Sequence, residues 1–207
     1  MKRWACTSMW LLGCLFAVQV MAAASPDEVV KTTTDQVLTR VRAEEAALKQ
    51  DTSKLYALVN ELIIPHFDFE RASQLVLGKY WRTADEAQRN RFQTAFKELM
   101  VRTYANALFQ YVDQHIEYKP SLKDAGGQRA VVRTEIIKQG ETPIPVNYRM
   151  VLKNGEWKVY DVFVDGISLV VTYRDSFASE IRQAGLDSLI THMQNHNQKL
   201  TAKADEQ

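Results

Sequence analysis

Two stretches of alternating apolar and polar residues decide the fold of this chain: RAVVRTEIIK (129–138) and IPVNYRMVLKNGEWKVYDVFV (144–164). Over most of both stretches, apolar residues recur at every second position, which is the period of a β-strand. Asn154–Gly155 inside the second stretch predicts a tight hairpin turn between antiparallel strands. A weaker strand near Ile116–Lys119 is expected to start the sheet. The sequence therefore predicts an antiparallel meander.

The alternation also assigns side chains to the two faces of this sheet. Strict alternation in the return strand, 157–164, divides its residues into two sets: Tyr160, Val162 and Val164 on one face, and Trp157, Val159, Asp161 and Phe163 on the other. The face with Val162 and Val164 is expected to meet the helices, because its neighbours in the preceding strand are also apolar.

Helices are expected both before and after the strands in the sequence. Upstream, a Ser25/Glu28 capping box starts one helix, and further helices are expected over 52–64, 68–77 and from a Thr83/Glu86 capping box to about Val112. Downstream, a helix is expected over 173–198, with a break at Gly185. Helices followed by antiparallel strands predict an α+β domain, with helices packed on one face of a curved sheet.

The first 24 residues have the layout of a secretory signal peptide. Lys2 and Arg3 are followed by an apolar stretch, 10–21, and by small residues that end at Ala24. Cleavage after Ala24 would leave residues 25–207 as one exported, soluble domain without an internal repeat or a long linker. A retained anchor is the alternative, although the apolar stretch is short for a membrane span of roughly 20 residues.

The two cysteines, Cys6 and Cys14, both lie in the segment expected to be removed. Leu11–Cys14 resembles a lipoprotein processing site, but Cys14 stands in the middle of the apolar stretch, which favours ordinary cleavage. The mature chain would then have no disulfide and no thiol chemistry. Removal of Lys2 and Arg3 changes the formal net charge from +1 to −1, and such a balance does not favour nucleic-acid binding.

The sequence offers few candidates for catalysis or metal binding. Gly166–Val170 resembles half of a nucleophile elbow but lacks the second glycine, so Ser168 is expected to be a turn or cap residue. His192 and His196 share a helix face, yet no third ligand lies within sequence reach. We therefore expect no metal site, no cofactor and no enzymatic activity.

Asp161 is the exception that deserves a separate hypothesis. A carboxylate in the middle of an apolar strand would have a perturbed pKa and would suit a general base of the isomerase type, with Tyr148 and Tyr160 as partners. The alternative is a structural carboxylate paired with Arg149 or Arg174. Both interpretations remain open at the level of the sequence.

Several motifs together are similar to those of one known family. They are Trp157–Val170 with Tyr173, Arg174 and Phe177 downstream, and Pro65–Phe69, Leu77–Arg82 and Phe92–Phe96 upstream. In this order, and behind a signal peptide, they resemble the MlaC family, the periplasmic phospholipid-binding proteins of the Mla (toluene-tolerance) transport system of Gram-negative bacteria.

This resemblance implies an NTF2/cystatin-like fold with a deep apolar pocket between helices and sheet. It also implies a monomeric periplasmic carrier. Such a carrier would shuttle phospholipid between an inner-membrane ABC transporter complex and an outer-membrane lipoprotein–porin complex, and would thereby maintain the lipid asymmetry of the outer membrane. The alternatives are a pocket enzyme that uses Asp161 and a protein-interaction module with a filled core.

Apolar residues on the predicted faces are the candidates for the pocket lining. The helical candidates are Leu75, Tyr80, Phe92, Phe96, Leu99 and Tyr104. The sheet candidates are Val132, Ile136, Val146, Tyr148, Met150, Val162 and Val164. Periodicity alone does not separate residues that line a pocket from residues that pack against each other.

A basic group, Lys79, Arg82, Arg89 and Arg91, surrounds one predicted helix start. These side chains would meet lipid headgroups or a partner protein, or would form a solvated face, which is the commoner role of such clusters.

Overall fold

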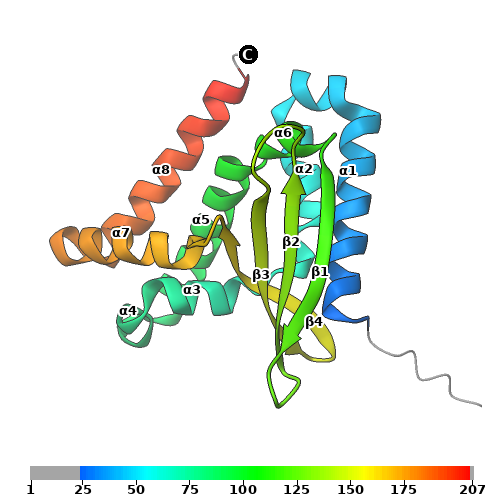
Figure 1. Cartoon of the computed structure of the whole chain (residues 1–207). Coiled ribbons are helices and arrows are strands. Elements are labelled where there is room, and N and C mark those ends of the chain that lie inside the picture. The colour runs from blue at the N-terminus through cyan, green and yellow to red at the C-terminus, as the bar shows by residue number, and fades with distance from the viewer. Residues whose placement is uncertain (1–23, 206–207) are drawn as a thin grey trace, which may run out of the picture.

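The computed structural model describes the backbone of residues 24–205 and the side chains of residues 24–201. The predicted signal peptide, 1–24, falls almost entirely outside the described residues. Figure 1 shows one twisted sheet with helices behind it and beside it. The predicted α+β class, with helices on an antiparallel sheet, is confirmed.

The sheet has five antiparallel strands in the order of the chain. They are β1 (His115–Lys123), β2 (Arg129–Ile137), β3 (Ile144–Lys153), β4 (Glu156–Val164) and the short β5 (Ile167–Ser168). Asn154 and Gly155 join β3 to β4 with φ angles of 54° and 82°. Positive φ at both central residues is the geometry of the predicted hairpin turn.

In the described part of the chain, seven helical segments precede the sheet and two helices follow it. The first group is α1 (Pro26–Gln50), α2 (Thr52–Leu62), the 3-10 turn η1 (Ile64–His66), α3 (Phe69–Leu77), α4 (Lys79–Thr83) and α5 (Glu86–Tyr104), and the short α6 (Ala107–Tyr111) links α5 to the sheet. The second group is α7 (Leu169–Ala184) and α8 (Leu186–Asp205), separated at Gly185 as predicted.

The start of α1 has the predicted capping box. The Glu28 N–H donates to the Ser25 hydroxyl (3.2 Å), and the Ser25 N–H donates to the Glu28 carboxylate (3.3 Å). The capping box predicted for α5 is displaced by two residues. Asp85 and Gln88 form it (2.8 and 3.2 Å), because Thr83 still belongs to α4, where its hydroxyl donates to the Tyr80 carbonyl.

This displacement yields a test of the capping assignment. We expect Asp85→Ala to lower the free energy of unfolding by about 1 kcal/mol, because the Gln88 N–H at the start of α5 loses its side-chain acceptor. Thr83→Ala, the matched control, removes the residue that the sequence predicted as the cap and should change stability by only a few tenths of a kcal/mol. Urea titration of both variants measures the difference, and equal losses would contradict the assignment.

The long helix predicted to reach Val112 ends at Tyr104 instead. After Ala105, the N–H of Leu108 donates to the carbonyl three residues earlier, and the N–H of Phe109 does the same. These shorter bonds turn the chain into α6, which lies beside the upper ends of β2 and β3 in Figure 1. The turn brings α6 to one end of the space between helices and sheet.

A β-bulge changes the faces that strict alternation predicted for β4. Arg149 lies opposite Asp161, but the next residue, Met150, lies opposite Val159, so Tyr160 is an extra residue without a cross-strand partner. Beyond this bulge the faces exchange. Trp157 and Val159 therefore share the helix-facing side with Val162 and Val164, and the prediction that they lie on opposite faces is wrong.

Three hydrophobic clusters hold the layers together. The first joins α3, α5, α7 and α8 around Phe92 and Phe177. The second joins α1, α2 and the end of α5 around Leu55. The third packs α1 against the sheet around Val132 and Met150.

Candidate ligand cavity

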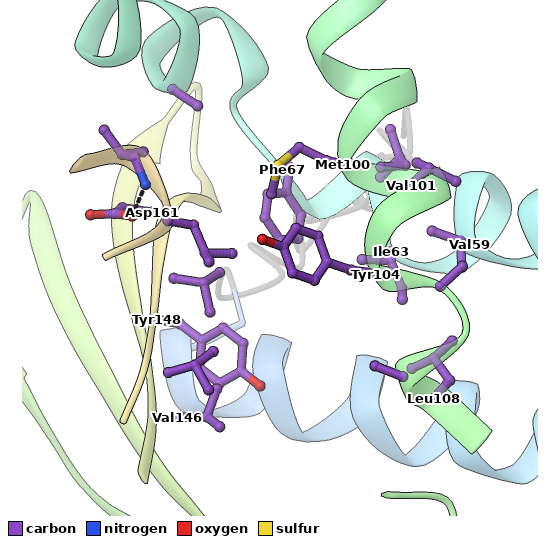
Figure 2. A pocket seen from close by; sticks show the side chains of 18 of the residues that line it. Val59, Ile63, Phe67, Met100, Val101, Tyr104, Leu108, Val146, Tyr148 and Asp161 are labelled. Carbon is purple, nitrogen blue, oxygen red and sulfur yellow. Dashed lines mark hydrogen bonds between the residues drawn. The ribbon is translucent and has the colours of Figure 1, made fainter. Parts of the chain in front are cut away.

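A large cavity lies where the three clusters meet, between the helices and the inner face of the sheet. Its volume is about 310 Å³, and the empty space between its walls is about 1240 Å³ when the open mouth is included. Figure 2 shows side chains that converge on it from the sheet and from the helices. The lining residues are Val59, Ile63, Ile64, Phe67, Phe69, Ala72, Phe96, Met100, Val101, Tyr104, Ala105, Ala107, Leu108, Tyr111, Ile136, Ile144, Val146, Tyr148, Tyr160, Asp161, Val162, Val164, Leu169 and Val170.

The wall of this cavity is almost entirely apolar. Nineteen of the 24 lining residues have side chains without a hydrogen-bonding group, four are tyrosines, and one, Asp161, carries a charge. Apolar cavities with few polar groups are typical sites for apolar ligands. A wall of this kind suits a hydrocarbon ligand.

The carboxylate of Asp161 is bound by other groups of the protein. The residue is only 5% exposed. Its carboxylate accepts from the Ser168 hydroxyl (2.8 Å) and from the Val170 N–H (3.2 Å), and the Arg149 guanidinium lies 4.0 Å away. Two of these contacts tie β4 to the first turn of α7, where an anion is favoured by the helix dipole. Asp161 is thus a structural carboxylate, with Arg149 and not Arg174 as its ion-pair partner.

Tyr148 and Tyr160, the proposed partners of Asp161, also line the cavity. The Tyr160 ring, however, lies under the Arg71 guanidinium at 4.8 Å. In Figure 2 the Tyr148 ring points into the cavity, below Asp161. The three residues share a wall, and the contacts of Asp161 given above run to α7 and to Arg149 rather than to these tyrosines.

Burial raises the pKa of the Tyr148 phenol to about 12, from an ordinary value of 10.0. A phenol whose pKa is higher in the folded than in the unfolded protein contributes its stability in full below pH 10, and this contribution disappears as the pH rises through 12. We expect the wild-type protein to lose roughly 2 to 3 kcal/mol more than Tyr148→Phe over this interval. Urea titrations at several alkaline pH values measure this, and parallel curves would contradict it.

Seven of the 13 predicted lining residues do line the cavity. They are Phe96, Tyr104, Ile136, Val146, Tyr148, Val162 and Val164. Their contact with a bound ligand stays a prediction.

The other six predicted residues do not line the cavity. The reason differs between the helical residues and the sheet residues. Phe92, Leu99 and partly buried Tyr80 pack in the first cluster, between α5 and the C-terminal helices. Val132 and Met150 face the same side of the sheet as the cavity residues, but α1 covers them in the third cluster. Leu75 is exposed on α3.

Several parts of the wall were not among the sequence candidates. Three are whole segments: the end of α2 with η1 (Val59, Ile63, Ile64, Phe67), the turn into α6 (Ala105, Ala107, Leu108, Tyr111) and the start of α7 (Leu169, Val170). The others are single positions on α3, α5 and β3: Phe69, Ala72, Met100, Val101 and Ile144. The run 167–171, which is apolar at every position except Ser168, was a usable signal, because it exceeds what one buried helix face requires.

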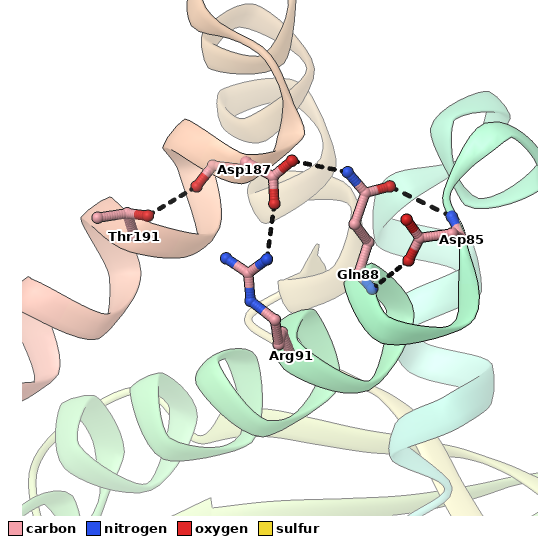
Figure 3. Close-up of polar contacts among 5 residues, drawn as sticks. All are labelled: Asp85, Gln88, Arg91, Asp187 and Thr191. Carbon is pink, nitrogen blue, oxygen red and sulfur yellow. Dashed lines mark hydrogen bonds and ion pairs between the residues drawn. The ribbon is translucent and has the colours of Figure 1, made fainter.

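The predicted basic group does not approach the cavity. The Arg89 guanidinium donates to the Trp81 carbonyl (3.0 Å) and stacks on its ring. Figure 3 shows that Arg91, together with Gln88, holds Asp187 at the start of α8, each at 2.8 Å. These contacts are structural. Two of the four basic residues, Arg89 and Arg91, are therefore engaged within the protein, which does not favour a role for them as headgroup ligands.

His192, one of the two histidines considered for metal binding, is engaged locally. His192 lies 2.9 Å from Glu180 and joins α8 to α7. Among residues that the structure describes, no three His, Cys, Asp or Glu side chains are grouped as a metal site would require. Within the same residues, every helix is too short or too polar to cross a membrane.

The fold and the cavity together define a class: an α+β protein whose helices and antiparallel sheet enclose a site for a large apolar ligand. The family model "MlaC protein" matches residues 31–195. The chain belongs to the MlaC family, as its motifs suggested.

Individual relatives agree with this assignment. The chain is 30% identical over 199 residues to the intermembrane phospholipid transport system binding protein MlaC of Haemophilus influenzae, a match that covers 94% of this chain and 92% of the relative. It is 33% identical over 173 residues to the toluene tolerance protein ttg2D of Pseudomonas putida (83% and 80% covered). A phospholipid-binding protein from Ralstonia solanacearum, solved in complex with a phospholipid, has a TM-score of 0.78 and 33% identity, with 86% of this chain and 99% of that chain covered.

Proposed function

We propose that this protein is a carrier that moves phospholipid between two membranes. The observation that carries the proposal is the apolar cavity, which opens to the surface and has walls without a free charge among the described residues. The names of the relatives, one of an intermembrane phospholipid transport system and one bound to a phospholipid, support it.

The physical problem that such a carrier solves is the cost of exposing acyl chains to water. Two chains expose roughly 30 methylenes at about 0.8 kcal/mol each, so a free phospholipid rarely leaves a bilayer. The cavity, about 310 Å³ in volume and open to the surface, offers apolar walls against which part of these chains can be buried, with the headgroup at the mouth.

Binding and release of a lipid require no bond to be made or broken, so we infer a non-enzymatic protein without a cofactor. The family membership supports a periplasmic location after export by the signal peptide. It also supports delivery between the inner-membrane ABC transporter complex and the outer-membrane lipoprotein–porin complex of the Mla system. Such traffic would maintain the lipid asymmetry of the outer membrane.

Native mass spectrometry of the purified mature protein, followed by lipid extraction, tests this function. We expect phospholipid at a fixed stoichiometry, and the intact mass counts its acyl chains. A protein that is free of lipid and stays so after incubation with phospholipid vesicles would refute the carrier. In that case, a core without a lipid-sized space would favour a protein-interaction module. A catalysed turnover that is lost in Asp161→Asn would favour a pocket enzyme.

A further inference from the structure

One aromatic side chain, that of Tyr104, lies in the opening of the cavity. Of the four tyrosines in the cavity wall, the other three are partly buried. Tyr104 is 40% exposed although it lines the cavity, so it lies where the cavity meets the solvent. Figure 2 shows its ring reaching from α5 into the space between the helices and the sheet. An acyl chain that enters or leaves here therefore meets this ring.

The exposure of Tyr104 also gives its ring freedom that two other tyrosines of the wall lack. The Tyr111 ring lies under the Lys138 ammonium at 5.4 Å. The Tyr160 ring lies under the Arg71 guanidinium at 4.8 Å. The Tyr104 ring borders the solvent, and exposed side chains change rotamer within nanoseconds. Tyr104 can therefore swing out of the opening unless another group holds it.

The geometry of α5 directs the Tyr104 hydroxyl toward α7. Phe96, Met100 and Tyr104 follow at intervals of four residues on one face of α5, and all three line the cavity. Helical side chains point back toward the N-terminus of their helix, so the Tyr104 side chain extends in the direction of Phe96. Tyr173, on α7, packs edge-on against Phe96 with ring centroids 5.4 Å apart. Tyr173 is thus placed near the end of the Tyr104 side chain.

The two hydroxyl groups are in contact. Burial and, after it, the Tyr104 phenol raise the pKa of the Tyr173 phenol. A neighbour has this effect when it accepts a hydrogen bond from the neutral hydroxyl, so Tyr173 donates to the Tyr104 oxygen. The Tyr173 ring itself is fixed, because it also lies 5.3 Å from Phe177 in the first cluster. A fixed side chain of α7 thereby holds the movable side chain of α5.

On the basis of the proposed carrier function, we propose that Tyr104 is a gate in the opening of the cavity and that the Tyr173 hydroxyl is the latch that holds it closed. The closed gate covers part of the opening and so limits contact between the bound acyl chains and water, which is unfavourable for every methylene exposed. Rotation of the ring toward the solvent opens the path. The rate of lipid release is then proportional to the fraction of molecules whose gate is open.

The latch should control the rate of exchange and not the amount of lipid bound. It joins two residues of the protein and does not involve the lipid, so it closes the empty cavity as it closes the loaded one. Loss of the latch therefore speeds entry and release alike. This difference between rate and amount distinguishes a latch from a residue that binds the lipid.

The test measures release of a phosphatidylethanolamine that carries a fluorophore on its headgroup, from loaded protein to phosphatidylcholine vesicles. At vesicle concentrations at which the rate no longer rises, release limits the transfer. The variants Tyr104→Phe and Tyr173→Phe lose one hydroxyl each and keep the ring. Tyr80→Phe is the matched control, because Tyr80 also packs against the first cluster but is not a lining residue. Native mass spectrometry records the bound lipid of each protein.

We expect Tyr104→Phe and Tyr173→Phe to release lipid about threefold to tenfold faster than the wild type and Tyr80→Phe, which is the range of one net hydrogen bond. Their bound lipid should equal that of the wild type. The double variant should be no faster than either single variant, because both substitutions remove the same bond. Tyr104→Ala, which removes the gate itself, should release lipid faster still.

Four outcomes would overturn the proposal. Release at the wild-type rate by both phenylalanine variants would overturn the latch, and so would rate increases that multiply in the double variant. Loss of bound lipid in these variants would assign the hydroxyls to lipid binding instead. A wild-type rate in Tyr104→Ala would overturn the gate. Failure of the carrier function is distinguishable from all four, because it would appear as a wild-type protein that holds no lipid.

Discussion

Val146→Glu should abolish the lipid content of the purified protein. Val146 lies on β3 with its side chain in the cavity, and it is not one of the residues of the three packed clusters. A carboxylate there must either stay hydrated, which excludes the acyl chains, or be buried among them without a partner. The penalty of several kcal/mol corresponds to a loss of affinity on the order of 100-fold or more.

A second substitution at the same position separates loss of the ligand from loss of the fold. Val146→Trp fills the space with apolar atoms and should also prevent lipid binding, while it leaves a folded protein. Asn147→Glu is the control, because it places the same charge on the adjacent residue of β3, which faces away from the cavity. Mass spectrometry and lipid extraction of the three variants measure the effect. A stable Val146→Glu protein with the wild-type amount of lipid would mean that the cavity is not the lipid site.

Asp161→Ala should cause the largest loss of stability among changes to the cavity wall. It leaves the Ser168 hydroxyl and the Val170 N–H without their acceptor at the start of α7. Hydrogen bonds to a buried charge contribute about 1.5 to 3 kcal/mol each, so we expect a loss of roughly 3 kcal/mol. In a chain of this length, that loss lowers the melting temperature by roughly 6 to 12 °C.

The lipid content of Asp161→Ala should also fall, because Leu169 and Val170 form part of the cavity wall at the start of α7. Asp161→Asn keeps an acceptor for the Val170 N–H and should cost less than half as much. Calorimetry and lipid analysis of the two variants measure both effects. Wild-type stability in Asp161→Ala would contradict the capping role. Loss of a catalysed turnover in Asp161→Asn, with fold and lipid intact, would instead favour the general base.

The elements of the fold were predictable where one local signal dominates. Asn154–Gly155 specified its hairpin, and Ser25 with Glu28 specified the start of α1, because turn and cap chemistry depend on neighbours in the sequence. The displaced cap at Asp85 shows the limit of this reasoning. The sequence pointed to Thr83, but Thr83 belongs to the short helix α4, which depends on tertiary packing, so the cap lies two residues later.

The site was predictable in part, for a physical reason. Periodicity finds the buried face of an element, but Val132 and Val146 have the same signal, and only the position of α1 distinguishes a packed residue from a lining one. The bulge at Tyr160 is likewise invisible to strict alternation. Phe67 follows the 3-10 turn η1 and Leu108 lies in the five-residue helix α6, and such short segments show no period.

The meeting of three hydrophobic clusters at one void has a consequence for the lifetime of the molecule. Apolar walls that face an unfilled, open cavity lack the contacts that a packed core provides, and a bound acyl chain supplies those contacts. Cargo thus completes the core, and the loaded protein unfolds less often than the empty one. Proteases, which cut opened chains, would therefore remove idle carriers first and spare those in use.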